Sequence, residues 1–181
     1  VGVSTMLLDK SLETPIDAVF IYNHNPVATH PDQNRMRKAL SRDDLFVVGA
    51  EIAMTDSMAY CDVVLPAASH FEYADIYGSY GHHYLQRAEP VIPPVGESLP
   101  NTEIFRRLAA RFGFDDPIFK ETDAELIDAA FLDGDARLDG GRPSTLPLDR
   151  AIEMKTVGGD ELILCDTVNP GTASGKIELF S

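Results

Sequence analysis

The stretch IDAVFIYNHNPVATHPD, residues 16–32, begins with a short apolar run and ends in a loop. Six of its first seven residues are apolar or aromatic, which predicts a buried strand over residues 16–22. NHNPVATHPD follows, and its two prolines and three Asn or Asp residues are typical of a loop. Beyond the loop, Met36, Ala39 and Leu40 recur at helical spacing and predict a helix that ends near Leu40.

Two more apolar runs complete a predicted parallel sheet. Residues 45–48 (LFVV), closed by Gly49, form the second predicted strand, and residues 62–65 (DVVL), stopped by Pro66, form the third. Residues 55–60, between them, are long enough for one or two helical turns. Short apolar strands that alternate with helices pair in parallel through right-handed crossovers, and helices cover both faces of such a sheet. The sequence therefore predicts the α/β class, with a Rossmann-like parallel sheet and flanking helices.

The rest of the chain mixes helices with irregular stretches. Residues 71–96 are rich in Tyr, Gly and Pro without a helical period, which predicts an extended excursion over the surface. An apolar stripe over residues 101–112, followed by Gly113, predicts a helix.

A capping box of Thr122 and Glu125 predicts another helix, over residues 122–132. The remaining expectations are a linker at 133–147, a short helix at 148–155, a strand at 161–165 and a tail. We therefore expect an α/β core over residues 1–115 and an irregular C-terminal extension over residues 116–181.

Composition and charge exclude several classes of protein. With 181 residues, of which 44% are apolar, the chain can form one full domain or a domain with a small appendage. Its 15 Lys and Arg residues stand against 29 Asp and Glu residues, which gives a net charge of −14. A duplex requires clustered cations that displace counterions, so no nucleic-acid partner is expected. No apolar run reaches about 18 residues, so no membrane span is expected either.

Several short motifs depart from the pattern that their chemistry would need. GTASGKI, residues 171–177, has too few residues between its glycines for a phosphate loop and no Ser or Thr after its Lys. DGDARLD, residues 133–139, lacks the Gly and the Glu of a calcium loop. Cys61 and Cys165 are too far apart for a zinc ribbon or an iron–sulfur cluster, and two lone cysteines are typical of a reducing compartment.

The histidines and possible nucleophiles predict no catalytic residue and no metal ligand in this chain. His82 and His83 are neighbours, so in an extended segment their side chains point to opposite sides and do not share an ion. A surface or packing role is favoured for them and for His24, His30 and His70. No Ser lies in a G-x-S-x-G elbow, and neither Cys has a local signature of nucleophilic catalysis.

The residues at the ends of the first two predicted strands are candidates for a binding site. They are Asn23, His24, Asn25 and Pro26 after the first strand and Gly49, Ala50 and Glu51 at the second. Ligands of open parallel sheets bind at the carboxyl ends of the strands. Asn side chains and loop amides can hold a phosphate, and an acidic side chain can accept hydrogen bonds from ribose or a guanine edge. The glycines of the dinucleotide fingerprint are missing, and an ordinary solvated carboxylate explains Glu51 equally well.

Five segments, taken in order, carry a resemblance to a known family. They are AVFIYNHNPVATHPD, then LFVVGAEIAMTDSMAYCDVVLPAASHFE, the glycine- and tyrosine-rich excursion, PPVGESLPNTEIFRRLAARFG and TASGKIELFS. In this order they resemble the molybdopterin oxidoreductases, large enzymes that include dimethyl sulfoxide reductases, formate dehydrogenases and nitrate reductases. The resemblance covers residues 16–113 and the last dozen residues. Each segment alone is a weak signal, but their order is specific.

The resemblance implies a part of a larger enzyme, similar to the third domain, which helps to hold a molybdopterin guanine dinucleotide that carries molybdenum or tungsten. The family's iron–sulfur cysteines and its molybdenum ligand lie upstream and have no counterpart here, so an iron–sulfur cluster is expected only upstream. The tail SGKIELFS is similar to the connector to a C-terminal β-barrel domain. The missing initiator Met agrees with an excised fragment, which we expect to be inactive alone.

The resemblance also implies which residues contact the nucleotide. At the two strand ends these are Asn25, Pro26, Ala50 and Glu51. Asn101 opens a helix where many relatives have an Asp that reads the guanine edge, although a helix N-cap explains this Asn equally well. Thr55 either donates to a phosphate or caps the following turn.

Two departures from the family pattern concern the pterin side. Tyr73 follows Glu72 where relatives often have a Lys, and the family's N-x-E-G-R stretch is replaced around residues 81–84. Tyr73 can stack on a ring or donate a hydrogen bond, but it brings no positive charge to the pyrophosphate. Backbone amides and the missing domains are therefore expected to supply most of the attraction for a polyanion.

Two alternatives keep the fold and change the function. One is a scaffold domain like the relative of this family in the catalytic subunit of NADH–quinone oxidoreductase; the polar residues Asn25, Glu51 and Asn101 argue against it. The other is a free-standing nucleotide-binding module. The partners expected on the favoured interpretation are the remaining domains of the parent chain, its small-molecule substrate and its electron-transfer partner. A cytoplasmic location is expected, with any export signal upstream of residue 1.

Overall fold

The computed structural model describes residues 2–131, 136–138, 141–156, 158–163, 166–167 and 170–178. By their contacts the residues form two units. The first unit comprises Val1–Glu72 and Ile92–Arg107, and the second comprises Tyr73–Val91 and Leu108–Ser181. This grouping follows packing, and the expected functional division into residues 1–115 and 116–181 stays a prediction. No helix in the described part of the chain is long and apolar enough to cross a membrane.

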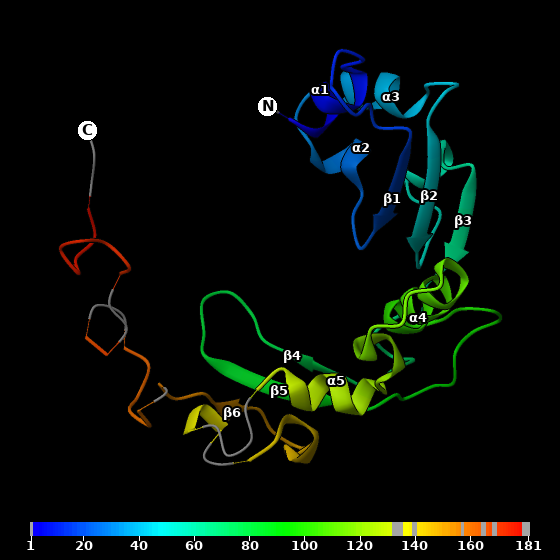
Figure 1. The fold of residues 1–181 in the computed structure, drawn as a ribbon. Helices are drawn as coiled ribbons and strands as arrows, with labels where there is room; N and C mark the ends of the chain where they lie inside the picture. Colours follow the sequence, from blue (N-terminus) through cyan, green and yellow to red (C-terminus); the bar gives the residue numbers. More distant parts are fainter. Residues whose placement is uncertain are drawn as a thin grey trace. The chain divides into compact units, whose positions relative to one another are not determined.

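The first unit contains a parallel sheet of three strands in the order β1-β2-β3 (Figure 1). The strands are β1 (Ala18–Tyr22), β2 (Phe46–Glu51) and β3 (Val63–Pro66). Ala18 pairs with Phe46, and Val48 pairs with Val63. The three predicted strands, their parallel pairing and the α/β class are confirmed, because apolar runs of this length suit strands that are covered by helices.

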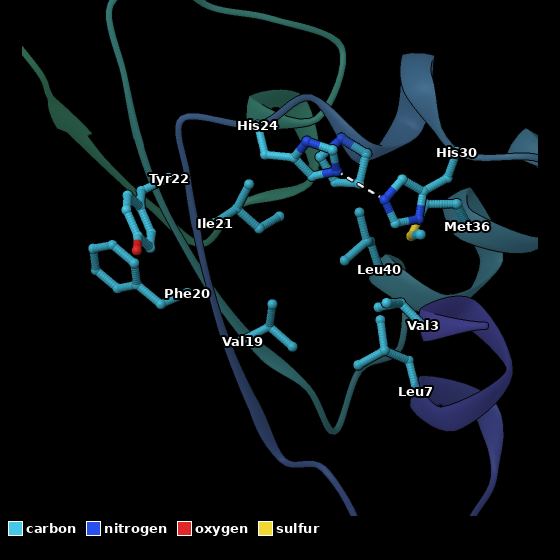
Figure 2. A pocket seen from close by; sticks show the side chains of 11 residues that line it. Val3, Leu7, Val19, Phe20, Ile21, Tyr22, His24, His30, Met36 and Leu40 are labelled. Carbon is cyan, nitrogen blue, oxygen red and sulfur yellow. Dashed lines mark hydrogen bonds between the residues drawn. The ribbon is translucent and has the colours of Figure 1, made fainter. Parts of the chain in front are cut away.

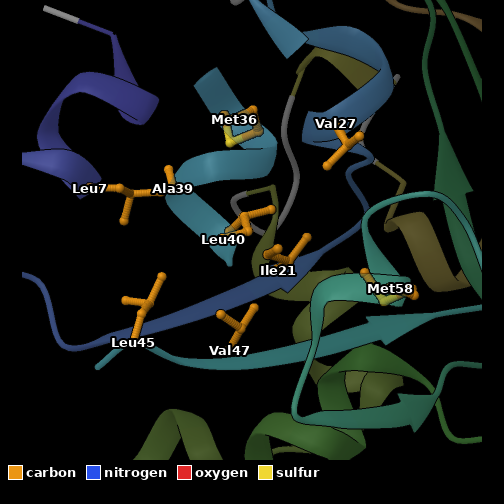
Figure 3. Packing of buried hydrophobic residues seen from close by; sticks show 9 residues of the cluster. All are labelled: Leu7, Ile21, Val27, Met36, Ala39, Leu40, Leu45, Val47 and Met58. Carbon is orange, nitrogen blue, oxygen red and sulfur yellow. The ribbon is translucent and has the colours of Figure 1, made fainter. Parts of the chain in front are cut away.

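Short helices pack against this sheet and close the core of the first unit. They are α1 (Val3–Leu8), α2 (Pro26–Thr29), α3 (Gln33–Leu40) and the single turn η1 (Met58–Tyr60). Asp32 caps the N-terminus of α3, because its side chain accepts a hydrogen bond from the Arg35 amide. Figure 3 shows the core, in which the side chains of Met36, Ala39 and Leu40 meet those of the strands. Its buried members are Leu7, Ile21, Val27, Met36, Ala39, Leu40, Leu45, Val47 and Met58.

Gly49 lets η1 approach the middle of the sheet. A Cβ atom at this position would overlap the Met58 sulfur and lie 2.9 Å from Cys61 Sγ. Glycine therefore serves close packing here, since its backbone lies in a regular strand.

Helix α4 (Asn101–Phe112) is amphipathic, as predicted, and its first turns belong to the first unit. Phe105 packs against Phe20 and Tyr22 of β1, at ring-centroid distances of 5.5 and 5.0 Å. The helix ends at Gly113, which has a left-handed φ of 74°, and the Phe114 amide donates to the Ala109 carbonyl. The predicted helix and its glycine stop are confirmed.

Glu72 holds together the two points where the chain leaves and re-enters the first unit. Its buried carboxylate accepts hydrogen bonds from the Ser69 amide at 2.6 Å, the Val95 amide at 2.5 Å and Ser98 Oγ at 3.1 Å. The hydrogen bonds from Ser69, and then those from Val95 and Ser98, lower the pKa of Glu72 to about 2. We call Glu72 with Ser69, Val95 and Ser98 the clasp.

The second unit has a small antiparallel sheet in the order β4-β5-β6. Its strands are β4 (Asp75–Tyr77), β5 (Tyr84–Ala88) and β6 (Ile152–Glu153). Its helices are α5 (Asp123–Ala129), η2 (Pro117–Lys120), η3 (Ala136–Leu138) and η4 (Pro143–Thr145). The capping box of Thr122 and Glu125 is confirmed. Among its described residues, Leu85, Leu138 and Leu146 form a buried hydrophobic cluster.

Several expectations for this second unit need correction. The excursion at 71–96 is extended, but it contains the β4–β5 hairpin, which was not predicted. The helix predicted over 148–155 is wrong, because the backbone amides of Met154 and Lys155 donate to the carbonyls of His83 and Arg137 instead of forming a helical turn. The predicted helix over 122–132 ends at Ala129.

Two further expectations fall partly outside the described residues. Of the strand predicted at 161–165, Glu161 forms an isolated bridge with Lys155, and residues 164–165 lie outside the described part. The linker predicted at 133–147 contains η4, while residues 133–135 and 139–140 lie outside the description.

Candidate functional site

The carboxyl end of β1 meets the start of α4 through two asparagines. Asn23 follows directly after β1 and has a left-handed φ of 51°, a conformation that Asn tolerates better than most residues. Its Oδ1 accepts a hydrogen bond of 2.8 Å from Asn101 Nδ2. This contact places Asn101 at the strand end where ligands of parallel sheets bind. Asn23 was not among the predicted contacts, although an Asn directly after a strand is a signal for such a turn.

Asn25 joins the loop after β1 to the loop after β2 through Ser57. Its Oδ1 accepts hydrogen bonds from Ser57 Oγ at 2.6 Å and from the Ser57 amide at 3.3 Å. Ser57 Oγ in turn accepts from the Val27 amide at 3.0 Å, and Ser57 is fully buried. In the described part of the chain, no hydrogen bond uses the Nδ2 group of Asn25, so this group can donate to a ligand. Ser57 was missed, because nothing in the TDS segment marks it as the partner of Asn25.

Within the part of the chain that the structure describes, two predicted site residues have a buried oxygen without a hydrogen-bond partner. These atoms are Thr55 Oγ1 and Asn101 Oδ1. A capping Asn or Thr would accept a hydrogen bond from a backbone amide with this oxygen. The capping alternatives for Asn101 and Thr55 are therefore wrong. A buried polar atom without a partner costs about 1–3 kcal/mol, so such atoms are expected where a ligand completes them.

The other predicted residues of the first unit lie at the same strand ends with different exposures. Pro26 is the buried first residue of α2. Ala50 is buried within β2 and pairs with Tyr22 of β1. Because it is buried, a ligand that arrives from solvent does not contact its methyl group. Glu51 is the last residue of β2 and half-buried, and its Oε1 accepts from the Ile52 amide. A ligand at this edge can reach the second oxygen of the Glu51 carboxylate.

Tyr73 belongs to the second unit, whereas the other six predicted contacts belong to the first. It is half-buried, and burial, followed by the charge of Asp75, raises the pKa of its phenol. Tyr73 therefore stays protonated at neutral pH and can donate a hydrogen bond.

The strand-end loops of the first unit carry no positive side chain. Residues 16–32 and 45–72 contain no Lys and no Arg, while Glu51 and Asp56 are acidic. A phosphate bound here would be held by amides and by neutral side chains such as Thr55 and Asn25. Among the described residues, no group of three or more His, Cys, Asp or Glu side chains is arranged to hold a metal.

Comparison with known proteins identifies relatives of this chain. The family model described as "Molybdopterin oxidoreductase" matches residues 3–111. The chain is 42% identical over 176 residues to "Probable oxidoreductase YoaE" of Bacillus subtilis, which covers 94% of this chain and 25% of that protein. It is 38% identical over 91 residues to a trimethylamine-N-oxide reductase of Vibrio parahaemolyticus, covering 49% of this chain and 11% of that protein.

A solved structure has the same fold. The chain superposes on acetylene hydratase from Pelobacter acetylenicus with a TM-score of 0.70 and 23% identity, over 98% of this chain and 23% of that one. The chain thus spans a quarter or less of the length of these proteins. The match of the family model, which covers more than half of the residues, shows that the chain belongs to the molybdopterin oxidoreductase family.

Proposed function

We propose that the first unit binds the nucleotide end of a molybdopterin guanine dinucleotide within a longer oxidoreductase. The observation that carries the proposal is the pair of buried, unpartnered oxygens at the strand ends, Thr55 Oγ1 and Asn101 Oδ1. When bound, the cofactor supplies a molybdenum or tungsten centre for two-electron chemistry, while the protein supplies binding and orientation.

The donor and acceptor pattern of these residues fits a guanine nucleotide. A guanine edge presents N–H donors, and Asn101 Oδ1 is an acceptor without a partner, held in place by the bond from its own Nδ2 to Asn23. Glu51 can accept from ribose hydroxyls. Thr55 Oγ1 can donate to a phosphate oxygen, and the Nδ2 group of Asn25 can do the same.

Asn25 is well positioned for this role, because Ser57 holds its side chain. The Ser57 hydroxyl and amide both donate to Asn25 Oδ1, which directs the Nδ2 group away from Ser57. This arrangement pre-organises a donor on a loop that contains no glycine and no cation.

We expect the activity to reside in the longer protein. The relatives that the chain matches are named oxidoreductases and reductases and are much longer. The described residues of this chain contain no grouped metal ligands of the kind that a catalytic centre needs. We expect an iron–sulfur cluster, the substrate site and the contacts with the electron-transfer partner in other parts of such a protein. Addition of the cofactor to the isolated chain should then give no turnover.

The test is the metal and pterin content of the full-length protein, measured by elemental mass spectrometry and cofactor extraction. Molybdenum or tungsten with guanine-containing pterin is the expected result. Iron without either metal would contradict the proposal and favour the scaffold alternative. Tight binding of GDP by the isolated chain, without pterin in the full-length protein, would favour a nucleotide-binding module.

Two substitutions test whether Asn101 and Thr55 contribute to cofactor binding in the full-length protein. Asn101→Ala removes the acceptor, and Thr55→Val replaces the hydroxyl with a methyl group of the same shape. Each should lower cofactor retention in the full-length protein about tenfold, the effect of one hydrogen bond of about 1.4 kcal/mol. Asn101→Asp keeps the acceptor. It loses the Nδ2 donor, but the Asn23 amide can turn so that its own Nδ2 donates to the new carboxylate, and this variant should retain the cofactor. The exposed residues Asn34 and Thr102 provide matched controls, Asn34→Ala and Thr102→Val, which should have no effect.

A further inference from the structure

His24 and His30 meet at the carboxyl end of β1, on either side of helix α2 (Figure 2). Their Nε2 atoms are 2.8 Å apart, and the ring centroids are 4.8 Å apart. One ring donates to the other in this contact, so both Nε2 atoms point into the same small space. Sequence analysis did not predict this pair, because five residues separate the two histidines.

The backbone between the two rings is fixed. The amides of Ala28 and Thr29 both donate to the Asn25 carbonyl, and the His30 amide donates to the Pro26 carbonyl. Thr29 Oγ1 adds a further bond of 2.9 Å to the Asn25 carbonyl. The side chains of His24 and His30 therefore leave the two ends of one short, hydrogen-bonded turn, and little order has to be gained for both to bind the same ligand.

The pair is open to solvent on one side and lies against an apolar cavity on the other. His24 is exposed and His30 is half-buried. Both line a cavity of about 330 Å³, whose other walls are mostly apolar side chains such as Leu7, Ile21 and Leu40. Figure 2 shows the two rings at the opposite end of this cavity from Val3 and Leu7. The apolar walls offer no charged group that would compete with the two imidazoles.

We propose that His24 and His30 together bind one Cu²⁺ or Ni²⁺ ion through their Nε2 atoms, with water in the remaining positions. Imidazole is a preferred ligand of these ions, which favour tetragonal or square-planar geometry. With nitrogen–metal distances of about 2.0–2.1 Å, two ligands at right angles have nitrogens about 2.9 Å apart, whereas tetrahedral ligands need about 3.3 Å. The hydrogen-bonded nitrogens are already 2.8 Å apart, so only a small change in their separation brings them to neighbouring corners of a square.

Binding requires only local changes at the two rings. The donor ring moves its proton from Nε2 to Nδ1, so that both Nε2 atoms carry a free lone pair. Each ring then turns so that the two lone pairs converge on the ion instead of on each other. The proton stays on the same ring in this change, so no other group has to accept it.

The experiment measures Cu²⁺ and Ni²⁺ binding to the full-length protein by calorimetric titration. His24→Gln and His30→Gln should each remove one binding equivalent or weaken it at least tenfold. The Cu²⁺ electron paramagnetic resonance spectrum should lose a component with two equatorial nitrogens in either variant. His24 is exposed, so unchanged thermal unfolding of His24→Gln without metal will show that the fold is intact.

His82 and His83 provide the matched control. These two histidines are also close in sequence. The Nδ1 atom of His82, however, already accepts a hydrogen bond of 3.1 Å from the Tyr84 amide. His82→Gln should leave the high-affinity equivalent unchanged. The proposal is overturned if His24→Gln binds both ions as the wild type does, or if His82→Gln loses as much binding as His24→Gln.

Discussion

The described residues of the two units differ in the size of their hydrophobic clusters and in the buried polar atoms that lack a partner. The first unit buries nine hydrophobic side chains in one cluster and still leaves Thr55 Oγ1 and Asn101 Oδ1 without a partner. The second unit buries three leucines in its cluster and relies on a capping box and on short strand pairings. The unpartnered oxygens lie in the unit whose larger core can offset their cost, as expected of a binding site.

The largest expected effect separates the two cores directly. Met36 is 1% exposed in the first core, so Met36→Ala should lower the free energy of unfolding by about 2–5 kcal/mol. Leu85→Ala in the second core should cost less, because few buried neighbours surround Leu85. Urea unfolding of the full chain measures both variants. If both variants lose the same free energy of unfolding, the expectation that the first core contributes more stability is contradicted.

Gly49→Ala tests whether the first unit is tightly packed up to its sheet. The added methyl group would overlap Met58 Sδ and press on Cys61 Sγ, which should cost about 1–3 kcal/mol of unfolding free energy. Gly78→Ala in the second unit meets no atom within 4 Å and is the control. A neutral Gly49→Ala, measured by thermal unfolding, would show that η1 shifts without cost.

The clasp gives the first unit a dependence on pH. The folded pKa of Glu72 is about 2, below the value of 4.5 for a free side chain, because Ser69, Val95 and Ser98 donate to it. The clasp should therefore stabilise the protein fully above pH 4.5 and lose its effect as the pH falls toward 2. Glu72→Gln should be less stable than wild type at pH 7, and the difference between them should shrink over this window. An unchanged difference across it would contradict the assigned pKa.

The smallest expected effect has the opposite sign. Thr55→Val removes a buried hydroxyl without a partner, so it should stabilise the cofactor-free protein by up to about 1 kcal/mol while it weakens cofactor retention. Thermal unfolding with and without the cofactor measures both effects. Destabilisation of the cofactor-free protein would show that Thr55 Oγ1 has a hydrogen-bond partner. The first unit would then contain one fewer unpartnered oxygen than proposed.

The elements that could be predicted are those that a local pattern determines. The three parallel strands are short apolar runs, α4 has a continuous apolar stripe, and α5 has its capping box. The strand β6 was mistaken for a helix, because its pairing to β5 depends on residues far away in the sequence. The β4–β5 hairpin was missed for the same reason.

The candidate site was predictable only in part. The residue types at the strand ends could be read from the sequence, and six of the seven predicted contacts lie in one unit. The contacts between Asn25 and Ser57, between Asn23 and Asn101, and between His24 and His30 depend on the fold. No sequence pattern distinguishes an Asn that caps a helix from one whose oxygen is left for a ligand.

The clasp has a consequence for how this region can change during evolution. Because Glu72 joins Ser69 on one side of the excursion to Val95 and Ser98 on the other, the two ends of residues 73–91 are fixed independently of what lies between them. The entropy of closing such a loop grows only slowly with its length. Residues 73–91 can therefore change in length at little entropic cost while the clasp keeps their ends in place, provided that β5 still brings Leu85 into the core of the second unit.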